Sequence, residues 1–187
     1  MSPAKRRGPG SKAAKAAKPA KAAKPAKRAP AAASGVDAEL ERLARAARDR
    51  AYAPYSHFRV GAALVAADGR IFTGANVENA SYGLTICAER NAVMAMVLAG
   101  ATDVRTIYVA SDIAPPASPC GMCRQTLLEF ARDPGTTRVV VVSPTDDHDA
   151  WTLAELIPHG FTGDELDRPR PAAVAPRRPP PRRPKAL

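Results

Sequence analysis

The sequence predicts an α/β fold in which a mixed β-sheet is sandwiched between helices. After residue 86, the pattern alternates helix, strand, helix, strand, an order typical of layered α/β folds. The run RVVVVS at 138–143 is too uniformly apolar for a half-exposed strand. It indicates a strand in the sheet interior, covered on both faces.

The first predicted element is a helix over about 37–51. Its apolar residues recur at helical spacing: Leu40, Leu43, Ala44 and Ala47. Pro54 ends the pattern, because proline cannot continue a helix.

A β-hairpin is expected next. Two apolar segments, 60–67 and 71–73, flank the dipeptide Asp68-Gly69, which favours a tight turn. The remaining predicted elements are helices over 87–99 and 120–131, strands over 105–110 and 138–143, and a helical turn over 153–156.

The charge of the chain is unevenly distributed. The formal net charge is +10, but the two ends hold 17 of the 28 basic residues and none of the 18 acidic ones. The segment between them carries 11 basic and 18 acidic residues, a net charge of −7. We therefore expect a disordered Lys/Ala/Pro tail over 1–35, one mildly acidic domain over 36–167, and a disordered Pro/Arg-rich tail over 168–187.

The basic tails leave open a contact with nucleic acid. Positive charges bind DNA or RNA electrostatically and without sequence preference. The tails contain no aromatic residue for base stacking, and the acidic middle segment offers no basic groove. Nonspecific contact is therefore one alternative, not the main prediction.

Cysteine usage and hydropathy favour a reducing compartment. The three cysteines, Cys87, Cys120 and Cys123, are few and odd in number, which makes a disulfide framework a poor explanation. No apolar run is long enough to cross a bilayer. The charged N-terminus is not followed by the apolar stretch of a secretory signal. We expect a cytoplasmic protein with no membrane association.

All three cysteines occur in two short motifs, Cys-Ala-Glu at 87–89 and Pro-Cys-Gly-Met-Cys at 119–123. Each motif lies at the predicted start of a helix, where the helix dipole favours a deprotonated thiol. Cys120 and Cys123 are spaced i, i+3 and share one face of the first turn. Structural zinc or redox chemistry remains an alternative for Cys-x-x-Cys alone. Three thiolates with an open fourth position are typical of catalytic zinc.

Three charged residues adjoin the cysteines. Glu89 is two residues past Cys87, so it can face a water activated by the metal without binding the metal, as a general acid/base. Three thiolates on Zn²⁺ leave a net negative centre, which is a weaker Lewis acid. Arg90 and Arg124 directly follow the motifs. We expect them to donate hydrogen bonds to the ligand sulfurs and so withdraw charge.

The motifs belong to a longer pattern. It consists of five blocks in order: YAPYSHFRVGAAL, GANVENASYG, ICAER, SPCGMCRQ and ELIPHGF. Over 36–167 the sequence resembles the small homotetrameric zinc-dependent cytidine deaminases of nucleoside salvage. The resemblance implies hydrolytic deamination of free cytidine and 2′-deoxycytidine with one Zn²⁺ per subunit. It also implies a three-layer α/β/α sandwich of about five strands, assembled as a homotetramer with shared active sites.

The resemblance assigns roles to individual residues. Cys87, Cys120 and Cys123 would hold the zinc ion, and Glu89 would transfer protons. The implied substrate-binding residues are Asn76 and Glu78 at the ribose 3′-hydroxyl, Phe58 stacked on the pyrimidine, the Ala88 backbone at the base, and Tyr82 and Phe161 in a neighbouring subunit's pocket. Alternatively, Asn76 is a plain turn residue and Phe58 a plain core residue.

Two rival functions share the zinc chemistry. Blasticidin S deaminases keep both cysteine motifs but act on a nucleoside antibiotic with a charged arm, whereas the segment NVENA favours ribose binding. A deaminase of polynucleotides is the second rival, although Glu78 would repel a 3′-phosphate. Met122 departs from the family, which usually has a small residue there.

Other polar residues have no predicted ligand role. Ser56 and Ser118 flank motifs and are expected to cap turns. The three histidines are not expected to bind metal. The aspartates of segment 146–149 are expected to form a solvated loop.

Overall fold

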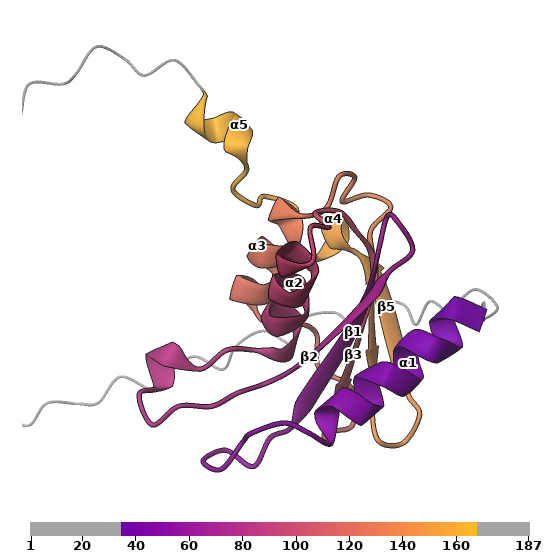
Figure 1. The fold of residues 1–187 in the computed structure, drawn as a ribbon, viewed down its shortest axis with the longest axis vertical. Helices are drawn as coiled ribbons and strands as arrows, with labels where there is room; N and C mark the ends of the chain where they lie inside the picture. The colour runs from indigo at the N-terminus through magenta and orange to yellow at the C-terminus, as the bar shows by residue number, and fades with distance from the viewer. Residues whose placement is uncertain (1–34, 168–187) are drawn as a thin grey trace, which may run out of the picture.

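The computed structural model describes residues 35–167, so the predictions for the two basic tails fall outside the described range. A mixed sheet of five strands forms the centre of the fold (Figure 1). In spatial order the strands are β2 (Ile71–Ala75), β1 (Val60–Ala66), β3 (Val104–Ser111), β4 (Arg138–Val142) and β5 (His148–Thr152). β3 and β4 are parallel, and the other neighbours are antiparallel. The predicted mixed sheet is confirmed.

Helices cover both faces of the sheet, which makes three layers as expected (Figure 1). The main helices are α1 (Gly35–Arg48), α2 (Ala88–Leu98) and α3 (Gly121–Glu129). α1 lies on one face, where Leu40 packs in a cluster with Val140. α2 and α3 lie on the other, where Met96 and Leu127 are fully buried in a larger cluster. Burying these apolar side chains drives the packing of the layers.

Three shorter helical segments complete the described chain: η1 (Tyr82–Leu84), α4 (Leu153–Leu156) and α5 (Gly163–Leu166). The helical turn predicted at 153–156 is α4. No helix within residues 35–167 is long and apolar enough to cross a bilayer.

The first turn of α2 lies directly on β2 at Gly74. A methyl group on Gly74 would collide with the backbone of Ala88 and of Ala92. Only glycine permits such a close approach of helix and strand. The contact sets the position of the start of α2, and with it Cys87, against the sheet.

One edge of the sheet is suited to ligand binding. β3 ends there at Ser111, which pairs with Val60 at the start of β1. In α/β sheets, ligands bind outside the carboxyl ends of the parallel strands. Polar residues that follow the ends of these strands can therefore line a ligand-binding site.

The segment 146–149 differs from its predicted form. β5 begins at His148, and Asp149 pairs with Val141 of β4. Asp146 forms an ion pair with Arg45 of α1 at 2.8 Å. The prediction of a solvated loop is wrong for Asp149, because the strand HDAWT has no apolar alternation and its conformation depends on pairing with β4. Asp146 and Asp147 lie in the loop between β4 and β5, and the Asp146 side chain is exposed.

Candidate active site

Three cysteine side chains from two helices converge beside the sheet. Cys87 is the N-cap residue of α2, and Cys120 is the N-cap residue of α3. The Sγ atom of Cys120 lies 4.0 Å from that of Cys87 and 3.4 Å from that of Cys123. All three sulfurs lie within 4.8 Å of one another. The two motifs, far apart in the chain, thus form one cluster.

The sulfur spacing fits a tetrahedral metal ion. Zn–S bonds of about 2.3 Å place the sulfurs of a tetrahedral site roughly 3.8 Å apart. The observed separations bracket that distance. Thiolates select soft or borderline ions such as zinc over magnesium or calcium, and three ligands leave the fourth position open.

The thiols influence one another's ionisation. The hydrogen bond with Cys123 lowers the pKa of the Cys87 thiol to about 5, and the charge of Arg90 acts in the same direction. The same pairing raises the pKa of Cys123 far above its ordinary value. One thiolate therefore forms readily while the next resists, and a bound cation is what would allow all three to ionise.

Glu89 lies beside the cysteines but inside the protein. It belongs to the first turn of α2 and is only 5% exposed. Burial raises the pKa of its carboxyl group, and the negative charge of Cys87 adds to this effect. A carboxyl group with a raised pKa can hold a proton near neutral pH and then release it.

A pocket of about 260 Å³ opens beside this cluster. Its walls include Cys87, Glu89 and Cys120 together with Phe58, Asn76 and Glu78. The structure therefore gathers the expected acid/base, two expected metal ligands and three expected substrate-binding residues around one cavity. No lysine or arginine is found among the described residues that line it. Ala88, whose backbone was expected to contact the base, is fully buried and is not among the residues that line the pocket.

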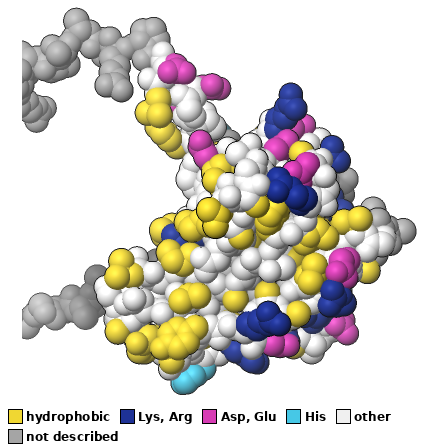
Figure 2. Space-filling model, in the orientation of Figure 1, with side chains coloured by type: hydrophobic (Ala, Val, Ile, Leu, Met, Phe, Trp, Pro, Cys, Tyr) yellow, Lys and Arg dark blue, Asp and Glu magenta, His cyan; other side chains and the backbone are white. Residues whose placement is uncertain are grey.

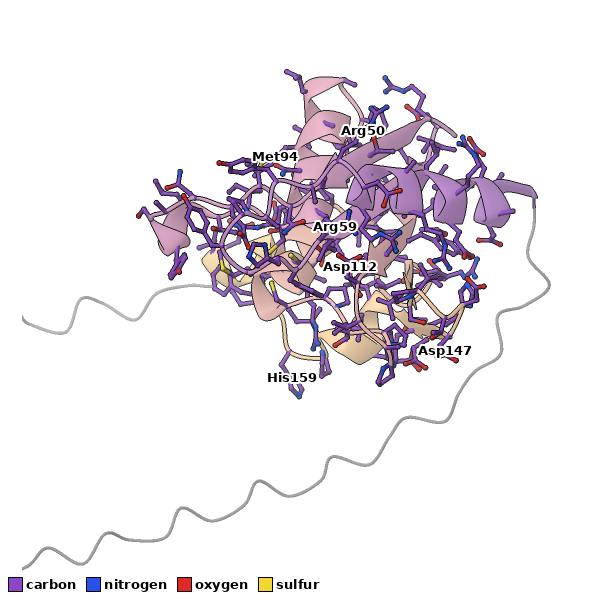
Figure 3. All side chains as sticks on the ribbon, turned by 90° about the horizontal axis from the view of Figure 1, so that it is seen from below. Arg50, Arg59, Met94, Asp112, Asp147 and His159 are labelled. Carbon is purple, nitrogen blue, oxygen red and sulfur yellow. The ribbon has the colours of Figure 1, made fainter. Side chains whose placement is uncertain are left out.

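The rim of the pocket is held by polar contacts. Asn76 Oδ1 accepts a hydrogen bond from the Val60 amide at 2.8 Å, and Asn76 Nδ2 donates to the Phe58 carbonyl at 2.9 Å. The ion pair between Arg59 Nε and Asp112 Oδ2, at 2.9 Å, joins the start of β1 to the end of β3 (Figure 3). These contacts place Phe58 beside the strand ends.

Arg90 lies close to the ligand sulfurs. Its Nη2 donates to the Thr85 carbonyl at 2.8 Å. Its Nε is buried and has no hydrogen-bond partner among the described residues. The guanidinium charge favours the Cys87 thiolate, which is the direction expected of a charge-withdrawing residue.

The prediction that Arg124 donates hydrogen bonds to the ligand sulfurs is wrong, because its side chain is engaged by other groups. Its three nitrogens donate to the Pro119 carbonyl at 2.7 Å, the Leu156 carbonyl at 3.0 Å and Ser118 Oγ at 2.8 Å. The side chain therefore ties the loop before α3 to α4. Met122, between the two cysteines of α3, is 62% exposed.

Tyr82 and Phe161 lie outside the pocket lining. They are 76% and 58% exposed. Gln125, to which the sequence assigned no role, holds the Phe161 backbone: its Nε2 donates to the carbonyl at 2.6 Å, and its Oε1 accepts from the amide at 3.1 Å. Its place in the block SPCGMCRQ was the only signal that could have found it.

The family model for the cytidine and deoxycytidylate deaminase zinc-binding region matches residues 34–143. The chain belongs to this deaminase family. It is accordingly a zinc-dependent hydrolytic deaminase, and the three-cysteine cluster suits one zinc ion.

Individual relatives resemble this deaminase over most of their length. The cytidine deaminase of Halalkalibacterium halodurans is 46% identical over 65% of this chain and 90% of its own. The probable cytidine deaminase of Dictyostelium discoideum is 46% identical over 68% of this chain and 87% of its own. The crystal structure of cytidine deaminase from Burkholderia pseudomallei matches with a TM-score of 0.63 and 44% identity, covering 66% of this chain and 98% of that one.

Proposed function

We propose that this deaminase converts free cytidine and 2′-deoxycytidine to uridine and 2′-deoxyuridine, with release of ammonia, in pyrimidine salvage. One observation carries the proposal: Glu89, Cys87 and Cys120 line the same pocket as Asn76 and Glu78. A proton carrier beside a metal-binding cluster thus faces groups that suit sugar hydroxyls. The names of the similar proteins, all cytidine deaminases, support the same substrate.

The reaction replaces the amino group at C4 of cytosine with the oxygen of water. Zinc held by Cys87, Cys120 and Cys123 would make a water molecule nucleophilic near neutral pH. Glu89 takes a proton from this water and gives it to N3 of the ring. It then delivers the second proton to the departing amino group. One water is consumed and one ammonia leaves, so the uracil product is neutral.

The polar groups of the pocket favour an uncharged nucleoside. Glu78 carries a negative charge that would repel a phosphate at the 3′ position, and no basic side chain lines the described pocket to offset it. Nucleotides and polynucleotides are therefore disfavoured as substrates. Blasticidin S remains the alternative, and competition between it and cytidine distinguishes the two.

We also propose a homotetramer in which Tyr82 and Phe161 reach a neighbouring pocket. Exposed apolar residues surround Tyr82 on adjoining segments, namely Tyr52, Tyr55, Val77 and Leu84. Figure 2 shows apolar side chains gathered at the end of the molecule where Figure 1 places η1. Such patches mark interaction surfaces. Light scattering should give the mass of four chains, and a monomer would refute this assembly.

The basic tails and the cysteines support two lesser proposals. The 17 basic residues of the tails would bind nucleic acid weakly, and the binding should weaken with salt. Gel retardation at two salt concentrations, with the tail lysines and arginines replaced by glutamine as control, tests this contact.

The cytoplasm is the proposed location, because the thiols must stay reduced to hold a metal.

The main test follows cytidine absorbance with purified wild type and Glu89→Gln, with the zinc content of both measured. We expect the wild type alone to consume cytidine and both proteins to contain zinc. A wild type that carries zinc but leaves cytidine and 2′-deoxycytidine unchanged would refute the substrate assignment.

A further inference from the structure

Hydrogen bonds from two consecutive residues, Tyr55 and Ser56, hold the carboxylate of Glu78. The Tyr55 amide donates to Glu78 Oε2 at 2.9 Å, and the Ser56 amide donates to the same oxygen at 3.2 Å. The Ser56 hydroxyl donates to the other oxygen, Oε1. A carboxylate has about four acceptor positions, so these contacts occupy most of them and fix its orientation.

The Ser56 hydroxyl has a second partner. Its oxygen accepts a hydrogen bond from the Phe58 amide at 3.0 Å. The Phe58 carbonyl in turn accepts from Asn76 Nδ2 at 2.9 Å, so the peptide groups on both sides of Phe58 are held. His57, between Ser56 and Phe58, has φ 56°, a left-handed conformation that is unfavourable for a residue other than glycine and that the surrounding contacts maintain.

The Ser56 hydroxyl therefore connects the proposed sugar-binding residue, Glu78, with the proposed base-stacking residue, Phe58. Ser56, Phe58, Asn76 and Glu78 all line the same pocket. We propose that Ser56 is a positioning residue for nucleoside binding, which holds Glu78 toward the sugar 3′-hydroxyl and Phe58 toward the pyrimidine ring. This inference rests on the proposed function and adds a specificity determinant to it.

The contacts also define which hydrogen bond remains for the ligand. The hydrogen bond from the Ser56 hydroxyl lowers the pKa of Glu78, so the carboxylate is ionised and accepts rather than donates. With its other positions occupied, it is oriented to accept one hydroxyl. Such preorganisation raises affinity, because the ligand does not have to order the carboxylate.

Ser56 is hydrogen-bonded to Glu78 and to the Phe58 amide. The proposed proton transfer and metal binding belong to other residues, Glu89 and the cysteines. Removing the hydroxyl should therefore weaken binding and leave the chemical step intact. In kinetic terms, KM rises while kcat stays nearly constant. The effect should be larger for a substrate that has a 3′-hydroxyl than for one that lacks it.

The experiment measures kcat and KM of wild type, Ser56→Ala, Ser56→Thr and Ser56→Val with 2′-deoxycytidine and 2′,3′-dideoxycytidine. Loss of a hydrogen bond to a charged group should raise KM for 2′-deoxycytidine about tenfold in Ser56→Ala, with a smaller rise for the dideoxy substrate. Threonine and valine have nearly the same shape and differ in the hydroxyl. Ser56→Thr should therefore approach wild type, and Ser56→Val should resemble Ser56→Ala.

The control removes a surface hydroxyl elsewhere. Thr136 is exposed, and its Oγ1 donates to the Asp133 carbonyl at 3.2 Å. Thr136→Ala should leave KM for both substrates unchanged. Equal KM values in Ser56→Thr and Ser56→Val would overturn the proposal, as would a fall in kcat at constant KM.

Failure of the proposed function has a different signature. Calorimetric titration with uridine, the expected product, measures nucleoside binding without turnover. A wild type that neither deaminates cytidine nor binds uridine would refute the function, and the role of Ser56 with it. A wild type that does both, with Ser56 variants that match it, would refute the role of Ser56 alone.

Discussion

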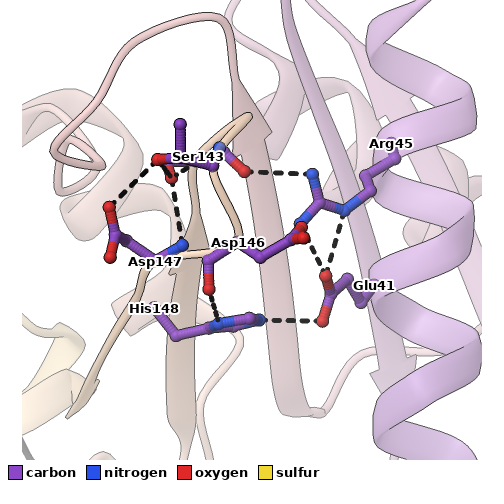
Figure 4. A network of polar contacts seen from close by, with 7 residues as sticks. Glu41, Arg45, Ser143, Asp146, Asp147 and His148 are labelled. Atoms are coloured by element: carbon purple, nitrogen blue, oxygen red, sulfur yellow. Dashed lines mark hydrogen bonds and ion pairs between the residues drawn. The ribbon is translucent and has the colours of Figure 1, made fainter.

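His148 Nε2 lies 2.9 Å from Glu41 Oε2, so the start of β5 is joined to α1 (Figure 4). Arg45 binds the other carboxylate oxygen of Glu41 at 2.7 Å and also reaches Asp146 at 2.8 Å. This network lies on the α1 face of the sheet, away from α2, α3 and the cysteines. It stabilises the fold independently of the site.

We expect Glu41→Gln to lower the free energy of unfolding at pH 7 by about 0.5–1 kcal/mol, as for a partly exposed ion-pair network. Partial burial acts to raise the pKa of Glu41, but hydrogen bonds from His148 and Arg45 outweigh it and hold the pKa below its ordinary value of 4.5. A carboxyl group with a lowered folded-state pKa contributes stability above its ordinary pKa and loses it as pH falls through the folded pKa.

The measurement is urea unfolding of wild type and Glu41→Gln across pH. The stability difference should shrink as the pH falls below 4.5, the ordinary pKa of this group. Glu39→Gln, which removes an exposed pair with Arg42, serves as control and should have a smaller effect. A difference that stays undiminished well below that pH would contradict the role of Glu41.

Removal of the metal should abolish activity and lower the thermal midpoint. A ligand that binds only the folded state stabilises that state by mass action, and the three sulfurs come together only in the fold. Treatment with a chelator followed by added Zn²⁺ should remove and then restore both properties, with magnesium as the control ion. An unchanged midpoint after verified zinc loss would contradict this coupling.

Replacement of Arg90 should weaken the zinc centre. Its guanidinium favours the Cys87 thiolate, and loss of such an outer contact typically costs about 10–100-fold in metal affinity or activity. Arg90→Gln should therefore lose zinc to a competing chelator at lower concentration than wild type. Arg105→Gln, at an exposed position of β3, is the matched control. If Arg90→Gln keeps wild-type zinc affinity and turnover, the charge-withdrawing role is wrong.

Gly74→Ala should destabilise the protein by more than about 2 kcal/mol, since overpacking against backbone cannot be relieved by side-chain movement. The added methyl would collide with α2 at Ala88 and Ala92. Gly163→Ala, where a methyl group meets open space, should be nearly neutral. Denaturant unfolding of the two variants makes the comparison, and equal stabilities would show that α2 can shift away from β2.

The metal-binding cluster was predictable because its chemistry depends on short spacings. Two thiols at i, i+3 at a helix start, and a third at another helix start, are visible along the chain, and the structure brings them together. The alternation of helices and strands was visible for the same reason, since each element has its own period. In the helices and strands that were predicted, only the ends differed; for example, α1 ends at Arg48 rather than at residue 51.

Contacts between distant residues left no such pattern. β5 is half-buried along its length, so its sequence lacks the alternation that marks most strands, and only pairing with β4 defines it. Ser56 and Glu78 are 22 residues apart, and Gln125 and Phe161 are 36 apart. Neither pair has a periodic signature, because each depends on how loops pass one another in the folded chain.

The position of Cys87 and Cys120 at the starts of two different helices has a consequence for the order of folding. Cys120 and Cys123 can meet as soon as the first turn of α3 forms, but Cys87 joins them only after α2 has packed on β2 and both helices share one face of the sheet. Full coordination is therefore a late event in the maturation of a newly made chain. The ion would be retained by molecules that have completed their topology and released by those that have not.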